Sequence, residues 1–219
     1  MRRTARQTGP ERRRTILAAA AEVFAARGYT AASMREIAAA AGITKPVLYD
    51  HFRAKDDLYL RLIEAARDEL IASSAAAMQL DAAAADRVRT AIERFFEHVE
   101  RRPAMARLLF TVPDGDRHVV EAVLRVQAEA TTRLATLLGG EPDLLPRAPD
   151  RERRLDLRME FVKKGLHGLA LWWLDHPDTP RTVVAEAASA VAWGGLRSLF
   201  EGSWRALDGA GVDRNENAP

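Results

Sequence analysis

The sequence predicts an all-α protein, and three observations carry that prediction. Alanine and arginine, both good helix formers, number 41 and 29 among the 219 residues. Long stretches repeat apolar residues at the three- and four-residue spacing of an amphipathic helix. No segment alternates apolar and polar residues for long enough to form a strand. We expect about nine helices, arranged as a small N-terminal helical domain followed by a larger one.

The first predicted helix opens the N-terminal domain. Pro10 suits its first turn, because this turn leaves backbone N–H groups unbonded and proline has none. Ile16, Ala20 and Phe24 recur on one helical face. Gly28 is expected to end the helix, since glycine is the usual residue just past a helix C-terminus.

Two short helices follow, joined by a tight turn at Gly42. Ser33 and Glu36 have the S-x-x-E spacing of a capping box, which satisfies two backbone N–H groups at a helix start. Thr44 is expected to cap the next helix, whose first turn tolerates Pro46. Two short helices joined in this way behind a longer one form a helix-turn-helix pattern.

The rest of the chain predicts longer helices separated by proline- and glycine-containing breaks. The expected helices span residues 57–78, 84–101, 103–111, 116–138, 152–175 and 180–204. The chain then divides into a flexible basic arm at 1–9, a helix-turn-helix domain at 10–56, a larger helical domain at 57–207 and a flexible tail at 208–219.

Composition excludes several kinds of site. The chain has no cysteine, which rules out a disulfide scaffold, a thiolate metal site and a cysteine nucleophile. No apolar run approaches the roughly 20 residues of a spanning helix. The N-terminus is similar to a secretory signal, but Glu22 interrupts its apolar run, and Phe24 and Arg27 continue the helical period. We expect a cytoplasmic protein that makes no membrane contact.

Catalytic and cofactor motifs are absent from the sequence. It contains no G-x-S-x-G, G-x-x-x-x-G-K or G-x-G-x-x-G. The histidines lack the H-E-x-x-H and E-x-x-H spacings of metal sites; they are His51, His98, His118, His167 and His176. We therefore expect no metal, no cofactor and no enzymatic activity. The alternative left open is a helical enzyme whose site is assembled from residues far apart in the chain.

Positive charge is concentrated at the N-terminal end. Residues 1–60 contain 11 basic and 6 acidic residues, a net charge of +5, whereas residues 61–219 carry −3. This asymmetry favours a domain that meets a polyanion such as nucleic acid, although a solvated basic tail gives the same pattern.

Residues 44–52 are the candidate recognition helix. Val47, Leu48 and Phe52 recur about one turn apart and are expected to face the core. The remaining side chains carry hydroxyl, cationic and ring groups that bind phosphates or base edges. The candidate DNA contacts are Thr44, Lys45, Pro46, Tyr49 and His51, with Lys55 at the start of the next helix. The alternatives are that Thr44 is only a cap and Tyr49 only a surface aromatic, or that the domain makes protein contacts alone.

Residues 28–58 strongly resemble the DNA-binding domain of the tetracycline-repressor (TetR) family. The family pattern is an aromatic after glycine, then I-A-x-x-A-G-[VI]-[ST]-x-x-x-[LIF]-Y-x-[HY]-F, then x-x-K-x-x-L. It is met by Tyr29, Ile37, Ala38, Ala41, Gly42, Ile43, Thr44, Leu48, Tyr49, His51, Phe52, Lys55 and Leu58. Pro46 departs from it, because many members carry glycine there. Ala32 stands where threonine is frequent, so Ser33 is expected to take over a DNA contact.

The resemblance implies a homodimeric repressor that is released from DNA by a small-molecule effector. Each subunit would place residues 44–50 in a major groove, on half-sites of a palindromic operator roughly 34–36 Å apart. The effector would shift the helix near 57–78 and with it the separation of the recognition helices. Arg2, Arg3 and Arg6 would add an arm on the DNA, a tail without contacts being the alternative.

The resemblance also assigns a ligand pocket and a dimer face to the larger domain. Large apolar residues on the middle helices are the pocket candidates, with plain core as the alternative: Phe95, Phe96, Met105, Phe110 and Met159. They favour a hydrophobic or amphipathic effector. The dimer-face candidates on the last two helices are Gly165, Gly168, Leu169, Trp172, Ala188, Val191, Gly195 and Leu199. Packing within the subunit is the alternative, although adjacent Trp172 and Trp173 cannot both face one core.

Overall fold

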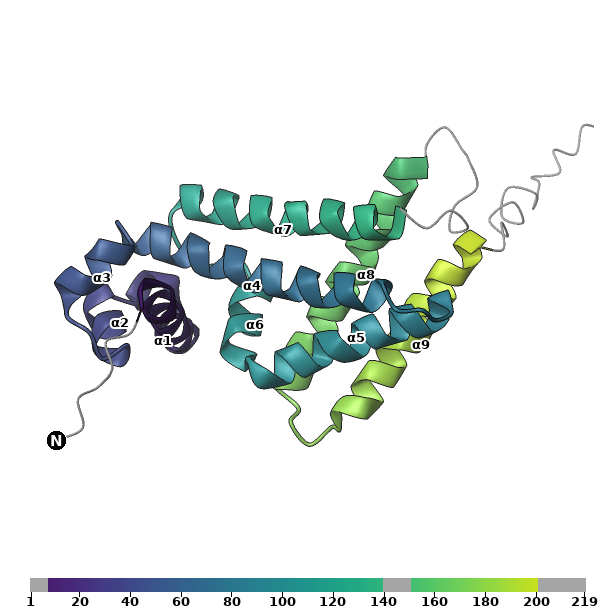
Figure 1. Ribbon diagram of the computed structural model, residues 1–219, viewed down its shortest axis with the longest axis horizontal. Coiled ribbons are helices and arrows are strands. Elements are labelled where there is room, and N and C mark those ends of the chain that lie inside the picture. The colour runs from purple at the N-terminus through teal and green to yellow at the C-terminus, as the bar shows by residue number, and fades with distance from the viewer. Residues whose placement is uncertain (1–7, 140–150, 201–219) are drawn as a thin grey trace, which may run out of the picture.

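The computed structural model describes residues 8–139 and 151–200. Within these ranges it contains nine α-helices and no strand, so the all-α prediction is confirmed (Figure 1). The helices are α1 (Gly9–Ala31), α2 (Met34–Ala40), α3 (Lys45–His51), α4 (Lys55–Met78), α5 (Ala84–Arg101), α6 (Pro103–Phe110), α7 (Arg117–Gly139), α8 (Arg151–Leu174) and α9 (Arg181–Phe200). No helix of these two ranges is long and apolar enough to cross a membrane. The predicted tail at 208–219 and residues 1–7 of the predicted arm lie outside the described residues.

Helix α1 begins as predicted and is kinked at its predicted end. Pro10 lies in its first turn, and Thr8 and Glu11 form a capping box there. Gly28 has φ 74° and ψ 167°, a conformation open to glycine because it has no Cβ. One more helical turn follows, however, and ends at Ala31. Gly28 is therefore a kink at which the first regular helix ends as predicted, and a separate short turn follows it directly.

Helices α2 and α3 confirm the predicted turn and the predicted capping box. The Ser33 hydroxyl accepts from the Glu36 N–H at 3.2 Å, and the Glu36 carboxylate accepts from the Ser33 N–H at 3.1 Å. The Ser33 hydroxyl also donates to the Glu36 carboxylate at 2.8 Å, and this bond together with the one from the Ser33 N–H lowers the pKa of Glu36. Gly42 makes the turn with φ 65°. Thr44 precedes α3 as predicted, but its side chain caps nothing. A cap bonds the second or third helical N–H, and the second position here is Pro46, which has none.

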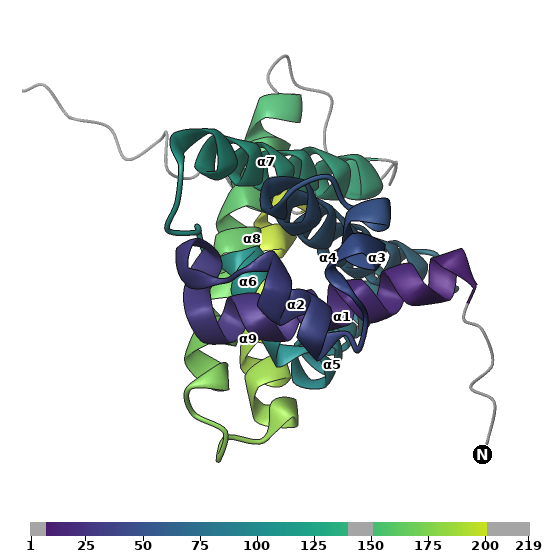
Figure 2. The same cartoon turned by 90° about the vertical axis from the view of Figure 1, so that its left-hand side faces the viewer.

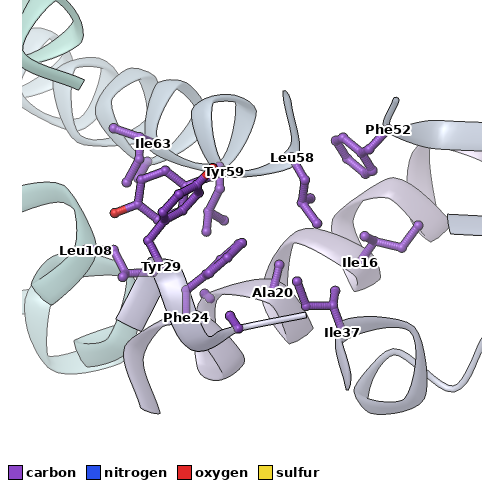
Figure 3. Packing of buried hydrophobic residues seen from close by; sticks show 14 of the residues in the cluster. Ile16, Ala20, Phe24, Tyr29, Ile37, Phe52, Leu58, Tyr59, Ile63 and Leu108 are labelled. Atoms are coloured by element: carbon purple, nitrogen blue, oxygen red, sulfur yellow. The ribbon is translucent and has the colours of Figure 1, made fainter. Parts of the chain in front are cut away.

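The hydrophobic core of α1–α3 continues into α4, α6 and α7. At its centre the Phe24 and Tyr59 ring centroids are 4.9 Å apart, and those of Tyr29 and Tyr59 are 5.0 Å apart (Figure 3). Ile63 of α4 and Leu108 of α6 belong to the same cluster. Figure 2, which views the molecule from this end, shows α1–α3 in front of the longer helices. A displacement of α4 or α6 therefore reaches the helix-turn-helix through packed side chains.

Helix α4 connects this end of the molecule to the rest. Helix α7 runs beside it in the same direction, as shown by the pairs His118–Asp56 at 2.6 Å and Arg133–Asp68 at 2.8 Å. Helices α5, α8 and α9 form most of a second core. The observed ends of α4–α8 and the start of α9 agree with the predicted ones within two residues, whereas the predicted end of the last helix at 204 lies outside the described residues.

Candidate DNA-binding surface, ligand cavity and dimer face

Helix α3 presents one buried and one exposed face, as the sequence predicts. Leu48 is fully buried, and Phe52 directly after the helix is also buried. About 100° round the helix from Leu48, Tyr49 is 44% exposed, and the Lys45 ammonium lies 5.7 Å from the centroid of its ring. A cation over an aromatic ring restrains both side chains. The exposed face therefore carries a positive charge and a partly restrained ring.

The other predicted DNA contacts differ in how exposed their side chains are and in whether their polar groups already make hydrogen bonds within the fold. Thr44 and Pro46 are exposed, and His51 is half-buried. Ser33 is half-buried and its hydroxyl already donates to Glu36 at 2.8 Å, so the capping box uses the group that the prediction assigned to DNA. Exposed charged residues of this unit that the sequence reasoning missed are Arg35, Asp50 and Arg53. These residues lie within or directly beside the two short helices, and this position in the sequence could have identified them as candidate DNA contacts.

The structure gives Lys55 a role within the fold. Its ammonium donates to the carbonyl oxygens of Tyr29, Thr30 and Ala32 at 2.9, 3.1 and 3.2 Å. These carbonyls belong to the extra turn of α1 and to the residue after it, which the bonds hold against α4. A lysine ammonium has three donors, so this geometry uses all of them and leaves none for a phosphate.

Lys55→Met is expected to destabilise the protein rather than remove a DNA contact. Hydrogen bonds from a charged donor contribute about 1.5–3 kcal/mol, and the carbonyls here are partly exposed, so the free energy of unfolding should fall by roughly 1–3 kcal/mol. Urea unfolding measures this. Lys45→Met, which changes an exposed lysine on α3, is the matched control and should alter stability by no more than about 0.5 kcal/mol. Equal stability of the two variants would contradict the assignment.

A hydrogen-bonded junction links the end of α1 to α4 and to the segment before α7. The Asp56 carboxylate accepts from the Tyr29 hydroxyl and pairs with the His118 Nε2 at 2.6 Å. These bonds hold the pKa of Asp56 below its usual value. The Thr30 hydroxyl donates to the Asp114 carbonyl at 2.8 Å. A Cβ on Gly115 would lie 2.7 Å from the Tyr29 ring, so the segment before α7 packs tightly against α1.

A cavity of about 130 Å³ lies among α4, α5, α7 and α8. Its wall is mainly aliphatic, as suits an apolar ligand. It is lined by Arg67, Leu70, Ile71, Ser74, Met78, Val88, Ala91, Ile92, Phe95, Leu109, Ala130, Leu134, Leu137, Met159, Val162, Lys163, Leu166, His167 and Ala192. Helix α4 thus contributes both to this wall and to the core beneath the helix-turn-helix.

The predicted pocket residues divide between the cavity wall and its surroundings. Phe95 and Met159 line the cavity. Phe96 packs edge-on against Trp173, with centroids 5.8 Å apart, and Met105 lies in the core shared with α1. Phe110 stacks on His167, with centroids 4.0 Å apart, and so supports the wall without lining it.

Two basic residues in the wall were missed by the sequence reasoning. Arg67 and Lys163 are 6% and 4% exposed. Arg67 pairs with Glu129 at 2.6 Å and with Asp68 at 3.0 Å, and Lys163 pairs with Glu160 at 2.6 Å. Lys163 lies among the apolar residues of the buried face of α8, and this position in the sequence could have identified it as part of the cavity wall.

His167 is held in its neutral form by the surroundings of the cavity. Burial lowers its pKa from 6.5 to about 3, the positive charges of Lys163 and Lys164 act in the same direction, and Glu160 opposes them. At neutral pH its ring therefore offers the cavity a hydrogen-bond donor or acceptor and no charge.

The depressed pKa of His167 predicts a loss of stability in mild acid. The unfolded chain takes up a proton near pH 6.5, whereas the folded protein does so only near pH 3. The unfolded state thus binds more protons between these values, and the free energy of unfolding should fall as pH falls through this window. Urea unfolding at several pH values measures the slope. His167→Phe should make it shallower, and an unchanged slope in that variant would contradict the prediction.

Helices α8 and α9 carry an exposed apolar face. The side chains of Phe161 and Val191 are 76% and 73% exposed, and Trp172 is 46% exposed while its neighbour Trp173 is buried. Leu157, Phe161, Gly165, Gly168 and Trp172 recur every three or four residues along α8, and the first two were missed by the sequence reasoning. This spacing places them on one face of the helix.

The remaining dimer-face candidates have different surroundings. Gly165, Gly168 and Gly195 are exposed, and no atom from elsewhere in the described structure lies within 4 Å of a Cβ built on them. Leu169 is half-buried, and Ala188 is buried in the core of its own subunit. The side chain of Leu199 lies outside the described residues.

Comparisons with known proteins agree with this architecture. The family model described as "Bacterial regulatory proteins, tetR family" matches residues 16–62, which span the helix-turn-helix. An HTH-type transcriptional activator, FasR of Mycolicibacterium smegmatis, is 35% identical over 201 residues, covering 89% of this chain and 87% of the relative.

Solved structures show the same fold along most of the chain. A TetR-like regulator from Rhodococcus sp. RHA1 superposes with a TM-score of 0.67 at 23% identity, covering 88% of this chain and 99% of that one. The regulator FadR of Bacillus subtilis, solved in complex with stearoyl-CoA, gives a TM-score of 0.64 at 17% identity and covers 86% and 98%. With the FasR relative matched over nearly its whole length, the protein belongs to the TetR family of transcriptional regulators.

Proposed function

We propose that the protein is a homodimeric regulator that binds a palindromic operator and changes its affinity for DNA when an aliphatic ligand enters its cavity. The observation that carries the proposal is the exposed face of α3, with Lys45 and Tyr49, on a helix-turn-helix of this family. This is the arrangement that places a recognition helix in a major groove.

Base contacts and phosphate contacts are assigned to different residues. Lys45 and Tyr49 are proposed to reach base edges, with Pro46 touching a thymine methyl group. Thr44 makes no capping bond, so its hydroxyl is available to a phosphate, and His51 can donate to another. Arg35 and Arg53 extend the list of candidate phosphate contacts, while Asp50 would disfavour a phosphate near it. The arm with Arg2, Arg3 and Arg6 is a further candidate.

The exposed face on α8 and α9 is proposed as the dimer interface. An apolar stripe of this kind is unfavourable in water and is typical of a protein–protein contact. A two-fold dimer uses the same face of each subunit twice. The exposed glycines allow the backbones of two subunits to approach closely. Such a dimer would present two copies of α3 to the two half-sites of a palindrome.

The effector is proposed to contain an aliphatic chain. The cavity wall is almost entirely apolar, and the Bacillus subtilis structure with the same fold was solved with stearoyl-CoA. The cavity volume of about 130 Å³ is close to the ~150 Å³ that admits a benzene-sized group and below the roughly 300 Å³ of small ligand sites. A long chain must therefore push the surrounding helices apart.

This expansion provides the proposed link to DNA binding. Arg67, Leu70 and Ile71 of α4 line the cavity, while Leu58 and Tyr59 of the same helix lie in the core beneath α1–α3. A ligand that favours a displaced α4 would alter the separation of the two recognition helices. Because a ligand shifts a conformational equilibrium only by its differential affinity for the two states, the form that fits the operator must bind the ligand more weakly.

The sign of regulation has two candidates. Repression follows if the bound dimer covers a promoter, as the family resemblance implies. Activation is favoured by the name of the Mycolicibacterium smegmatis relative. To decide between repression and activation, transcription from a promoter that carries the protein's operator is measured in a cell extract with and without added protein. We propose that the protein acts in the cytoplasm, where the DNA that it would bind is found.

The proposed function is tested by adding ligand to the protein–DNA complex. Fluorescence anisotropy follows a labelled operator duplex, identified by selection from a random pool, while dodecanoate or dodecanoyl-CoA is titrated in. We expect the acyl compound to release the protein from the duplex, and more of the compound to be needed at a higher protein concentration. CoA alone at the same concentration should release no protein. Unchanged anisotropy with both acyl compounds would contradict the proposed effector class.

A further inference from the structure

Lys163 is a buried cation in an otherwise largely apolar wall. Its ammonium donates to the Gln127 carbonyl at 2.9 Å and to the Thr131 hydroxyl, both on α7, and pairs with Glu160 at 2.6 Å on its own helix. A buried ammonium must keep such partners, because an unpaired charge in an apolar environment is strongly unfavourable. These partners therefore decide what the cavity can accept beside Lys163.

The charges around the cavity are arranged with positive groups inside and negative groups outside. The side chains of Lys163 and Arg67 are 3% and 7% exposed, whereas those of Glu160 and Glu129 are 42% and 59% exposed. Among the described residues that line the cavity, two are basic and none is an acid. The wall thus presents an inward positive potential that an anionic or strongly polarised oxygen would match.

Lys163 is also better placed than Arg67 to take a new partner. Arg67 is held by two carboxylates, Glu129 and Asp68. The only carboxylate paired with Lys163 among the described residues is that of Glu160, which is 42% exposed. Glu160 also accepts from the Thr131 hydroxyl and lies 3.9 Å from the Lys164 ammonium. A ligand carboxylate can therefore replace Glu160 as the charge partner of Lys163 while Glu160 keeps Lys164 and water, and a thioester carbonyl can accept from the same ammonium.

We infer that the Lys163 ammonium binds the acyl oxygen of the aliphatic ligand, so that the effector is a fatty acid or its thioester rather than a hydrocarbon or an alcohol. This inference rests on the proposed function and names the ligand group that the cavity recognises. Lys163 supplies one ammonium and His167 a neutral ring, which suits a carboxylate or a carbonyl. A phosphate in this position would need more donors.

The same anchor lies on a continuous set of contacts towards the DNA-binding end. The backbone carbonyl of Gln127 accepts from the Lys163 ammonium. The side-chain amide of the same residue donates to the backbone carbonyl of Leu109, at the end of α6, at 3.0 Å. The segment between α6 and α7 then meets α1 through the bond between Asp114 and Thr30. A ligand oxygen that competes for the Lys163 ammonium acts at the first of these contacts.

The test compares three probes that share one chain: dodecanoate, dodecanoyl-CoA and 1-dodecanol. Isothermal titration calorimetry measures their binding to the full-length protein, below micellar concentrations. Lys163→Met keeps the length of the side chain and removes its charge. It is expected to weaken binding of the acyl probes by about 10- to 100-fold, the range of a hydrogen bond to a charged group, and binding of the alcohol by less than about threefold. The two acyl probes distinguish the free acid from the thioester as the source of the oxygen.

Two further variants separate recognition from structure. Lys164→Met removes the charge of the exposed neighbour on α8, which pairs with Glu160 at 3.9 Å, and should alter the three affinities by less than about threefold. Glu160→Gln weakens the internal competitor for Lys163 and should tighten acyl binding several-fold, about threefold or more. A purely structural role of Lys163 would not give tighter binding in this variant.

The outcomes separate the anchor from the proposed function. Equal losses for dodecanol and dodecanoate in Lys163→Met, or acyl binding as tight as in the unmodified protein, would overturn the anchor alone. If the unmodified protein binds none of the three probes, the aliphatic effector of the proposed function is wrong together with the anchor.

Discussion

Tyr49→Ala is expected to abolish specific operator binding while the fold stays intact. Tyr49 is 44% exposed on α3, about 100° round the helix from the buried Leu48, and its ring lies against Lys45. A good contact to a base edge contributes about 1–3 kcal/mol, and a dimer loses the contact at both half-sites. The expected loss is roughly 2–6 kcal/mol, or about 30-fold to 25,000-fold in affinity. Electrophoretic mobility shift with the selected operator measures it.

The control for Tyr49→Ala is Leu124→Ala on α7, because Leu124 is also 44% exposed. Both variants should unfold within about 0.5 kcal/mol of the unmodified protein. Only Tyr49→Ala should lose affinity for the operator. Full operator affinity in a folded Tyr49→Ala protein would show that α3 does not read DNA in the proposed orientation.

Phe161→Glu is expected to convert the dimer into a monomer. Phe161 is the most exposed large apolar side chain of the described residues, at 76%, and it lies in the apolar stripe of α8. An aromatic residue at the centre of an interface contributes about 2 kcal/mol or more, and a two-fold interface contains it twice. The dissociation constant of the dimer should rise about 1,000-fold or more, and operator affinity should fall with it.

Light scattering after size-exclusion chromatography measures this change against the chain mass of 24.2 kDa. The unmodified protein should give twice that mass at micromolar concentration, and Phe161→Glu should give the chain mass. Leu124→Glu introduces the same charge at an exposed position on α7 and should remain dimeric. A dimeric Phe161→Glu protein would exclude this face of α8 from the interface.

Local features of the fold were predictable because their causes lie within a few residues. The Ser33–Glu36 capping box and the turn at Gly42 each depend on spacing and backbone conformation alone. Thr44 stands at the N-cap position but its side chain makes no capping bond, and Pro46 removes one of the two N–H groups that it could have bonded. Trp173 is buried and Trp172 is exposed, as expected for adjacent tryptophans that cannot both face one core.

Features that depend on distant residues were not predictable from periodicity. The extra turn of α1 beyond Gly28 is held by Lys55, which lies on another helix. The size and apolar character of Phe95 and Phe110 made them pocket candidates in the sequence. These properties could not show that one lines the cavity while the other stacks behind the wall on His167.

The burial of the charged Lys163 side chain could not be predicted from the local sequence either. A lysine is usually exposed. Lys163 would therefore be expected at the edge of the buried face of α8, with its ammonium in water. Its burial depends on Gln127 and Thr131 of α7, more than 30 residues earlier in the chain. The pairing of Asp56 with His118 is likewise a tertiary contact that no local pattern encodes.

Whether this protein reads an operator as a dimer is measured by selecting bound duplexes from a random DNA pool and then determining the affinity of the selected duplex at several salt concentrations. We expect a palindromic consensus with half-sites separated by about one helical turn, roughly 34–36 Å. The logarithm of the affinity should fall linearly with the logarithm of the salt concentration, with a slope of about −0.9 for each phosphate neutralised. No enrichment by folded, dimeric protein that has been freed of ligand by unfolding and refolding would contradict the claim that this protein reads an operator.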